Sequence, residues 1–258
     1  MGYAPLDLTT KTAVVIGGTS GIGLTIAKGL AQAGANILPT GRRTELVESA
    51  VADIKKAGGK ALAMRSDVTD RASLEALLNA AIVEFGAVDI LVNSAGTTKR
   101  TPTLDVSESE WNNILETNLS GTLRACQVFG RHMIDRKRGR IINIASLSSF
   151  VALYEVAAYS ASKAAVASLT KSLAIEWARH GVCVNAIAPG VFRTDLNAAL
   201  LDGTARGREF LLRTPMGRFG QLEELIGAAI FLASDSASFV TGHLLSVDGG
   251  ALASGVNQ

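Results

Sequence analysis

Short apolar runs rich in β-branched residues alternate with longer stretches of helical periodicity, and this alternation restricts the fold more than any other feature. Strands are predicted at 12–17, 35–40, 61–66, 88–93, 140–146, 182–188 and 243–247. Helices are predicted at 21–34, 45–56, 71–85, 110–136, 159–180 and 223–233. Because the strands are apolar almost throughout, both faces of their sheet must be covered. The sequence therefore predicts an α/β fold, a Rossmann-type doubly wound parallel sheet with helices on both faces.

The size of the chain fits one domain of this kind. It has 258 residues, and 48% of them are hydrophobic, which is enough for one sizeable core. We therefore expect residues 1–258 to form a single dinucleotide-binding catalytic domain. The segment 193–220 is rich in Gly, Arg and polar residues. It is predicted to be a loop-and-helix insertion that covers a substrate.

Several function classes find no support in the composition. A net charge of +2 gives no reason to expect nucleic acid or an acidic membrane as partner. No apolar run reaches the roughly 18 residues that span a bilayer, and the first eleven residues, MGYAPLDLTTK, contain no apolar signal. The two cysteines and three histidines show no metal-ligand spacing. We expect a soluble cytoplasmic protein without a metal.

A glycine-rich run follows the first predicted strand and opens the first predicted helix. It reads Gly-Gly-Thr-Ser-Gly-Ile-Gly at 17–23. Glycines let the backbone approach a pyrophosphate, and the helix N-terminus offers unpaired N–H groups to it. The spacing is G-x-x-x-G-x-G rather than G-x-G-x-x-G, so a glycine-rich turn without a ligand remains the alternative. The predicted cofactor contacts in this loop are Gly17, Thr19, Ser20, Gly21, Ile22 and Gly23.

The end of the second predicted strand bears on the choice of cofactor. An NAD site usually places Asp or Glu there to hold the ribose 2′-hydroxyl. Here the chain reads Thr-Gly-Arg-Arg at 40–43. The guanidinium groups of Arg42 and Arg43 suit a 2′-phosphate, although a solvated turn would also explain them. We predict that NADP(H) is favoured and that NAD(H) is possible.

Tyr159 and Lys163 lie four residues apart in a predicted helix, and therefore on one face of it. A free tyrosine has a pKa of about 10 and is a poor base at neutral pH. A nearby ammonium and a positively charged nicotinamide favour the phenolate, so Tyr159 could act in general acid–base catalysis. Such pairs also occur by chance on helix surfaces. The surroundings favour the functional interpretation, because Asn118, Ser146 and the ends of three strands are expected at the same edge of the sheet, where open parallel sheets bind ligands.

In this order and spacing, the motifs GGTSGIG, NSAG, YSASK, PG and VDGG resemble those of the short-chain dehydrogenase/reductase family, from about Leu8 to Gly250. The resemblance implies an NAD(P)-dependent oxidoreductase acting on CH–OH groups. Ser146 would then hydrogen-bond the substrate oxygen, and Tyr159 would be the general acid/base. Lys163 would bind the nicotinamide ribose and lower the pKa of Tyr159. Asn118 would hold a water that links Lys163 to solvent.

Further cofactor contacts follow from the same resemblance. They are Asp67 and Val68 at the adenine, Asn93, Ala95 and Gly96 at the adenosine ribose, and Val191 and Thr194, after Pro189 and Gly190, at the carboxamide. The resemblance also implies a homotetramer in which the helices at 110–136 and 159–180 meet across an interface. Two positions depart from the family pattern. Ile16 replaces a common threonine and Ser94 replaces the second asparagine of NNAG; both bear on loop stability and cofactor affinity.

Substrate selection depends on the loop after the fourth predicted strand. Its Arg100 could bind a carboxylate bidentately, or could be an ordinary solvated charge. The loop looks like that of the sugar-acid dehydrogenases of the family, the gluconate 5-dehydrogenase and 2-keto-3-deoxygluconate dehydrogenase group. Ser148 would add a hydroxyl suited to a polyol. Arg193 lies either near the pocket mouth or in a surface pair. We predict hydride transfer between NADP(H) and a carbonyl or secondary alcohol of a small sugar acid or polyol.

Two alternatives stay open. The first is a 3-oxoacyl or general carbonyl reductase of the same family, which would need a basic docking face. The run Arg-Lys-Arg-Gly-Arg at 136–140 is the candidate for that face, and a solvated helix end is its other interpretation. The second is a non-catalytic nucleotide-binding protein on the same fold. The presence of all four expected catalytic residues favours an enzyme.

Overall fold

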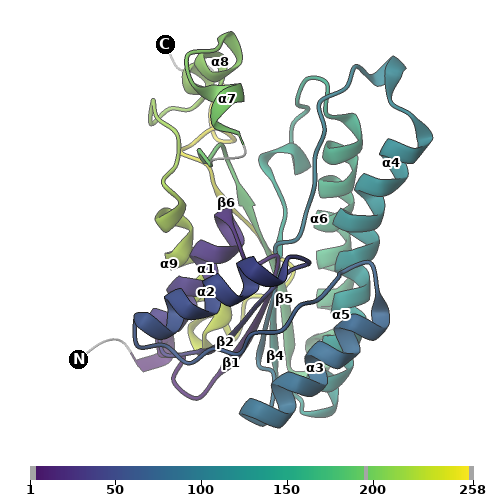
Figure 1. The fold of residues 1–258 in the computed structure, drawn as a ribbon. Helices are drawn as coiled ribbons and strands as arrows, with labels where there is room; N and C mark the ends of the chain where they lie inside the picture. Colours follow the sequence, from purple (N-terminus) through teal and green to yellow (C-terminus); the bar gives the residue numbers. More distant parts are fainter. Residues whose placement is uncertain (1–3, 195–196, 256–258) are drawn as a thin grey trace.

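The computed structural model describes residues 4–194 and 197–255, and one parallel six-stranded sheet lies at their centre (Figure 1). The strand order is β2-β1-β3-β4-β5-β6, which confirms the predicted doubly wound arrangement. The strands are β1 (Thr12–Ile16), β2 (Asn36–Thr40), β3 (Ile90–Asn93), β4 (Gly139–Ile144), β5 (Val182–Pro189) and β6 (Leu244–Val247).

Helices cover both faces of the sheet (Figure 1). One face carries α1 (Gly21–Gln32), α2 (Thr44–Lys56) and α9 (Ile226–Ala233). The other carries α3 (Arg71–Phe85), α5 (Gly121–Asp135) and α6 (Ala157–Trp177), with α4 (Glu108–Leu115) beyond them. The short helices α7 (Ala198–Leu201) and α8 (Ala205–Arg213) lie past the carboxyl ends of the strands, at the top of Figure 1.

The strands divide their side chains between two apolar clusters. Val15 and Val92 pack with residues of α1 and α9, whereas Val14 and Leu91 pack with residues of α3 and α5. Successive side chains of a strand point to opposite faces, so a strand buried on both sides must be apolar at every position. This is why the strands show continuous apolar runs rather than alternation.

The chain changes direction in the sheet beside β1. From β1 it moves outward to β2, then crosses back so that β3 pairs with the other edge of β1. Open α/β sheets bind ligands in the crevice at such a switch point. Gly17 follows β1, and the backbone N–H of Ser94, after β3, donates to the carbonyl of Ile16 at 2.8 Å. The glycine loop and the NSAG motif therefore border this crevice.

The predicted strand at 61–66 is wrong in the described structure. Only Ala61 forms a bridge, to Ile37, through hydrogen bonds that Ile37 exchanges with Lys60 and Leu62. The next residue of β2 that would donate outward is Pro39, which has no N–H group. The ladder therefore ends after one bridge, and the described sheet has six strands rather than the seven expected.

The predicted helix at 110–136 is interrupted. A five-residue π-helical turn, Glu116–Ser120, separates α4 from α5. Such turns insert an extra residue into the helix and often occur at functional sites. This one contains Asn118, whose side chain is fully buried. The predicted helix at 159–180 also differs at its ends, because α6 begins at Ala157 and a 3₁₀ turn, Ala178–His180, follows it.

The segment at 193–220 contains the helices α7 and α8. Residues 195–196 of this segment, and the first three residues of the N-terminal stretch, lie outside the described residues. Within the part of the chain that the structure describes, no helix combines the length and the apolar character needed to cross a membrane.

Candidate active site

The glycine loop requires glycine because other backbone approaches it closely. Gly17 has φ +76°, and a Cβ added there would lie 2.5 Å from the backbone nitrogen of Ala95. A Cβ on Gly23 would lie 2.1 Å from the carbonyl oxygen of Gly17. Both distances are far below van der Waals contact. The loop is therefore pressed against the residues after β3, in the place expected for a pyrophosphate-binding turn.

The first turn of α1 has amide groups available for an anion. Ser20 is the N-cap, and its side chain makes no capping hydrogen bond within the described residues. The first N–H groups of a helix have no intrahelical partner, so they can bind phosphate oxygens. The Cγ2 of Thr194 lies 3.8 Å from the position of a Cβ on Gly21. The segment after β5 thus reaches across to the glycine loop.

Arg42 and Arg43 are exposed beside this loop. The carbonyl of Thr40 accepts hydrogen bonds from the N–H groups of Gly17 and Gly18, at 2.9 and 3.1 Å. The end of β2 is thereby attached to the glycine loop. Burial acts to raise the pKa of Asp67, but hydrogen bonds from Thr69 and the charge of Arg42 lower it overall. Asp67 therefore lies near Arg42.

Tyr159, Lys163 and Ser146 meet at the carboxyl edge of the sheet. Tyr159 lies in the first turn of α6, and Lys163 lies one turn later, with its Nζ 5.8 Å from the centroid of the Tyr159 ring. Ser146 follows β4, and its hydroxyl hydrogen-bonds Tyr159. The residues come from two separate elements, β4 and α6. The structure therefore brings together three of the four predicted catalytic residues.

Asn118 connects this group to the loop after β3. Its Oδ1 accepts from the N–H of Thr97 at 2.8 Å, and its Nδ2 donates to the Thr97 carbonyl at 2.9 Å and to the Ser162 hydroxyl at 3.0 Å. A Cβ on Gly96 would lie 3.4 Å from Asn118 Oδ1 and 3.6 Å from Lys163 Nζ. Asn118 and Lys163 therefore both lie next to Gly96.

Without a cofactor, burial is the largest influence on the pKa values of Tyr159 and Lys163. Burial lowers the pKa of Lys163 to about 8, and the ammonium donates to the Ile144 carbonyl at 2.6 Å. Burial also raises the pKa of Tyr159, against the opposing effect of the hydrogen bond from Ser146. The lowering of the tyrosine pKa that the family resemblance implies therefore requires the charge of a nicotinamide ring in addition to Lys163.

Replacing Lys163 is expected to stabilise the fold. The pKa of about 8 lies below that of a free lysine, so at pH 7 the folded protein carries a buried charge at a cost. Between pH 8 and about 10.4 the unfolded chain binds more protons, so the cost disappears as pH rises. We expect Lys163→Met to raise the free energy of unfolding at pH 7 by about 1–3 kcal/mol, after allowing for the lost Ile144 bond.

Urea unfolding at pH 7 and pH 9.5 tests this expectation. The difference between Lys163→Met and the natural chain should shrink at the higher pH. A variant that is less stable at pH 7, or a difference that grows with pH, contradicts the account of a buried charge at this position.

Ser148 has a buried hydroxyl without a hydrogen-bond partner among the described residues. Its backbone N–H donates to Ser146 Oγ at 3.1 Å, which places the two serines in one turn. Most buried polar groups in folded proteins are hydrogen-bonded, and exceptions call for an explanation. A bound ligand would supply the missing partner, in keeping with the predicted substrate contact of Ser148.

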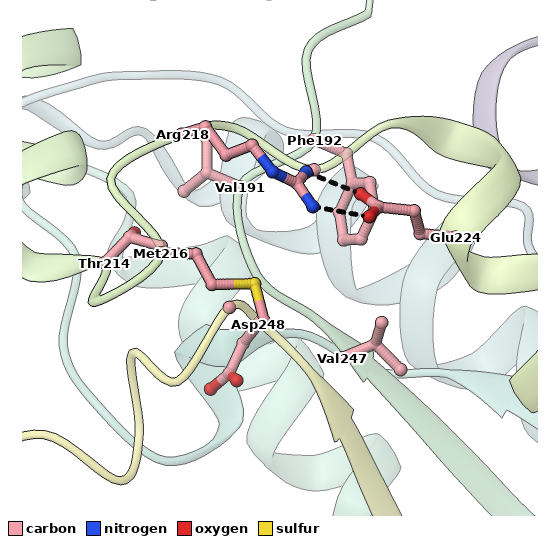
Figure 2. A pocket seen from close by; sticks show the side chains of 10 residues that line it. Val191, Phe192, Thr214, Met216, Arg218, Glu224, Val247 and Asp248 are labelled. Atoms are coloured by element: carbon pink, nitrogen blue, oxygen red, sulfur yellow. Dashed lines mark hydrogen bonds and ion pairs between the residues drawn. The ribbon is translucent and has the colours of Figure 1, made fainter.

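A pocket of about 130 Å³ lies at the carboxyl ends of β5 and β6 (Figure 2). Val191, one of the predicted cofactor contacts, lines it together with Thr214, Met216 and Asp248. The sequence pattern does not predict these last three as site residues, although Asp248 belongs to the VDGG motif. The predicted contact Gly190 packs directly against Asp248, since a Cβ there would lie 2.7 Å from Asp248 Cα.

An ion pair lies at the rim of this pocket. The Arg218 guanidinium meets both carboxylate oxygens of Glu224, at 2.6 and 2.8 Å (Figure 2). A hydrogen bond from Arg218 lowers the pKa of Glu224 to about 2. Pro189, the last residue of β5, pairs in register with Val247 of β6. The two strand ends and the segment at 214–224 therefore enclose the pocket together.

The cations considered for other roles have carboxylate partners. Arg100 pairs with Glu155 at 2.6 Å, and Arg193 pairs with Asp202 at 2.6 Å within the insertion. In the basic run at 136–140, Arg136 pairs with Asp89, and Arg138 and Arg140 pair with Asp235. These pairs reduce the local excess of positive charge in the run, which leaves a weaker docking face for an acidic carrier.

The cysteines, a histidine and Ile16 have surroundings that bear on the other sequence predictions. Cys126 and Cys183 are both free thiols. Within residues 4–194 and 197–255, no three His, Cys, Asp or Glu side chains are grouped so that they could hold a metal ion. His132 Nε2 accepts a hydrogen bond from the N–H of Val88. Ile16 is buried in the apolar cluster with α3 and α5, so it contributes packing there.

Comparisons with known proteins agree with this geometry. The family model described as enoyl-(acyl carrier protein) reductase matches residues 17–251. The gluconate 5-dehydrogenase of Gluconobacter oxydans is 42% identical over 244 residues, covering 95% of this chain and 95% of that protein. The 3-oxoacyl-(acyl carrier protein) reductase of Escherichia coli is also 42% identical, over 95% of this chain and 98% of its own length.

A solved structure gives the same result for the fold. The gluconate 5-dehydrogenase of Burkholderia cenocepacia, in complex with NADP and tartrate, superposes with a TM-score of 0.93 at 41% identity, covering 97% of this chain and 98% of that one. Its similarity in both sequence and structure therefore covers nearly the whole chain. The chain therefore belongs to the short-chain dehydrogenase/reductase family of oxidoreductases.

Proposed function

We propose that this protein transfers a hydride between NADP(H) and the carbonyl or secondary alcohol of a sugar acid or related polyol. The observation that carries the proposal is the meeting of Ser146, Tyr159 and Lys163 beside the glycine loop. The loop and the open first turn of α1 fit a dinucleotide, because they combine close backbone approach with available N–H groups.

The chain's own residues manage the proton and the substrate oxygen. The nicotinamide, when bound, supplies or accepts the hydride. Ser146 holds the substrate oxygen, and the Tyr159 hydroxyl gives it a proton during reduction or takes one during oxidation. Lys163 binds the nicotinamide ribose, and its charge favours the tyrosinate. Asn118, fixed by three hydrogen bonds, holds the water that links Lys163 to solvent.

The remaining cofactor contacts follow the edge of the sheet. The glycine loop would bind the pyrophosphate, while Asp67 and Val68 would contact the adenine. Asn93, Ala95 and Gly96 would flank the adenosine ribose. Pro189, Gly190, Val191 and Thr194 would position the carboxamide. The relative solved with NADP supports the phosphorylated cofactor, and the exposed Arg42 and Arg43 beside the loop supply charges for its 2′-phosphate.

A double variant tests this choice of cofactor. Arg42→Ala/Arg43→Ala is expected to raise KM for NADPH by about 10- to 100-fold, because charge-assisted bonds to the 2′-phosphate are lost. KM for NADH should change by less than about threefold. Steady-state kinetics with both cofactors measures the effect. Equal losses for the two cofactors would show that these arginines do not read the 2′-phosphate.

Relatives support the sugar-acid substrate class. The chain is similar to gluconate 5-dehydrogenase over almost its full length, and the solved relative is in complex with tartrate, which is itself a hydroxy acid. The alternative, a 3-oxoacyl or general carbonyl reductase, is supported by the similarity to the Escherichia coli reductase. The carboxylate partners of the basic run at 136–140 weigh against it.

A substrate screen decides between the two. Purified protein is assayed with sugar acids, polyols and 3-oxoacyl thioesters, each with NADP⁺/NADPH and with NAD⁺/NADH. We expect the highest kcat/KM with a sugar acid and NADP(H). A 3-oxoacyl substrate that exceeds every sugar acid by tenfold would replace the proposal with its alternative, and no turnover with any of them would support a non-catalytic role.

The assembly and the location are also part of the proposal. Helices α4, α5 and α6 carry partly exposed Trp111, Leu123 and Ile175, which supports a homotetramer that buries them. Two free thiols fit a reducing compartment, which supports the cytoplasm. We propose that residues 1–258 act as one catalytic domain. Sedimentation analysis giving a monomer at micromolar concentration would contradict the tetramer.

A further inference from the structure

Four residues form a group at the outer end of the loop after β3, and we call them the mouth cluster: Arg100, Tyr154, Glu155 and Arg206. Arg100 belongs to that loop, and Tyr154 and Glu155 precede α6. Arg206 belongs to α8 in the insertion. The N–H of Thr101 donates to the Glu155 carbonyl at 2.8 Å, which joins the first two segments. Three segments far apart in the sequence therefore meet here.

Two short stretches of the chain connect the mouth cluster to the proposed reaction site. Glu155 is four residues before Tyr159. On the other path, Thr97 is bound to Asn118 by two hydrogen bonds, and only three residues separate it from Thr101, which is bound to Glu155. A substrate whose reacting carbon lies at Tyr159 would therefore extend its far end toward this cluster.

Arg100 already has a carboxylate partner. Its Nε donates to one carboxylate oxygen of Glu155 at 2.7 Å, and its Nη2 lies 2.6 Å from the same oxygen. Its guanidinium carbon also lies 5.9 Å from the centroid of the Tyr154 ring, within the range of a cation–π contact. Glu155 itself has φ +61°, a conformation that side chains other than glycine rarely adopt and that is found at functional sites. The ion pair of Arg100 and Glu155 is thus held in a fixed geometry, and its two charges are not freely solvated.

Arg206 is the second guanidinium of the cluster. Its Nη1 donates to the carbonyl of Tyr154 at 3.2 Å, and its guanidinium carbon lies 5.5 Å from the ring centroid of Phe210. Within the described ranges it makes no ion pair with a carboxylate. Burial lowers its pKa, the charge of Arg100 acts in the same direction, and Glu155 and Glu209 oppose both. Arg206 is therefore a partly desolvated cation close to Arg100.

The charges of the mouth cluster do not balance. The cluster has two guanidinium groups and one carboxylate, that of Glu155, which pairs with Arg100. Arg206 is held instead by a backbone carbonyl and an aromatic ring. Like charges at short distance repel each other, and a second anion would relieve this repulsion. A guanidinium suits a carboxylate because its N–H groups match the two oxygens.

We propose that Arg206 binds the carboxylate of an acidic substrate and that Glu155 holds Arg100 beside it as a supporting charge. This assignment rests on the proposed function and names the residue that selects acidic over neutral substrates. The substrate carboxylate supplies the second negative charge that the mouth cluster lacks.

The experiment compares gluconate with sorbitol, which has the same carbon chain but a neutral CH₂OH group in place of the carboxylate. Arg206→Ala is expected to raise KM for gluconate by about 10- to 100-fold and to change KM for sorbitol by less than about twofold. Arg208→Ala is the matched control. Arg208 lies on the same helix and its guanidinium donates to the Gly203 carbonyl, so both KM values should stay unchanged.

A second pair of variants separates the two arginines. Arg100→Ala should raise KM for gluconate, because Glu155 loses its partner and turns to Arg206. Adding Glu155→Gln to Arg100→Ala removes that competitor, so the KM for gluconate should return to within about threefold of the natural value. If the double variant stays as poor as the single one, Arg100 itself binds the carboxylate and the assignment to Arg206 is overturned.

The outcomes distinguish this inference from the proposed function. An enzyme that oxidises gluconate normally after Arg206→Ala refutes the role of Arg206 and leaves the sugar-acid activity intact. Equal losses on gluconate and sorbitol show that Arg206 supports the insertion rather than the carboxylate, which also refutes the role. If the natural chain oxidises neither a sugar acid nor a polyol, the proposed substrate class itself fails.

Discussion

Tyr159→Phe is expected to lower kcat by about 10²- to 10⁴-fold, the usual contribution of general acid–base catalysis. The substitution removes only the hydroxyl that exchanges a proton with the substrate oxygen. The ring remains in the first turn of α6, and Lys163 keeps its hydrogen bond to the Ile144 carbonyl. The Kd for NADPH should therefore change by less than about threefold. Steady-state kinetics gives kcat, and fluorescence titration gives the Kd.

Tyr154→Phe is the matched control for this variant. It makes the same chemical change five residues earlier, on a side chain that is 72% exposed, and the ring that faces Arg100 is retained. Its kcat should stay within about twofold of the natural value. If Tyr159→Phe also retained more than a tenth of the natural kcat, another group would have to supply the proton.

Gly23→Ala is expected to disable cofactor binding and to destabilise the fold. The new Cβ would lie 2.1 Å from the Gly17 carbonyl oxygen and 3.0 Å from Ser94 Oγ. Gly17 belongs to the proposed dinucleotide site and Ser94 lies between two of its residues, so the loop must move away from α1. We expect a loss of about 1–3 kcal/mol in the free energy of unfolding, as for other overpacked sites, and a rise of about 100-fold in the Kd for NADPH.

The same substitution at Gly227 has the opposite expected effect. Gly227 lies in α9, and a Cβ there meets no atom within 4 Å among the described residues. Alanine is favoured over glycine in helices by about 1 kcal/mol, so Gly227→Ala should raise the free energy of unfolding and leave the Kd for NADPH unchanged. Urea unfolding and fluorescence titration measure both variants. A Gly23→Ala protein that behaves like Gly227→Ala would contradict the close packing of the loop.

Local patterns in the sequence predict much of this molecule. Continuous apolar strands indicate a covered parallel sheet, because a strand buried on both faces is apolar at every position. Helix periodicity places Tyr159 and Lys163 on one face of α6, because residues four apart share a face. Both inferences depend on neighbours along the chain. The segment at 61–66 shows the limit of such patterns. Its apolar run predicts a strand, but β2, the strand it would pair with, contains Pro39 and cannot continue the ladder.

Contacts between distant segments depend on the tertiary structure alone. The π turn at Asn118 has no signal in helix periodicity, and the pocket residues Thr214, Met216 and Asp248 are brought to Val191 only when β6 and the insertion pack beside β5. The mouth cluster is a further case, because Arg100, Glu155 and Arg206 are separated by about 50 residues each.

The physical reason lies in the range of the interactions. Strand and helix patterns reflect which face of an element is apolar, and that is a property of adjacent residues. The pairing of a charge and the desolvation of a side chain depend on which other segments surround it after folding. The sequence thus identifies Tyr159, Lys163 and the glycine loop through their spacing. Only the packed structure shows that Arg100 already has a partner in Glu155, whereas Arg206 lies beside them without an ion pair in the described residues.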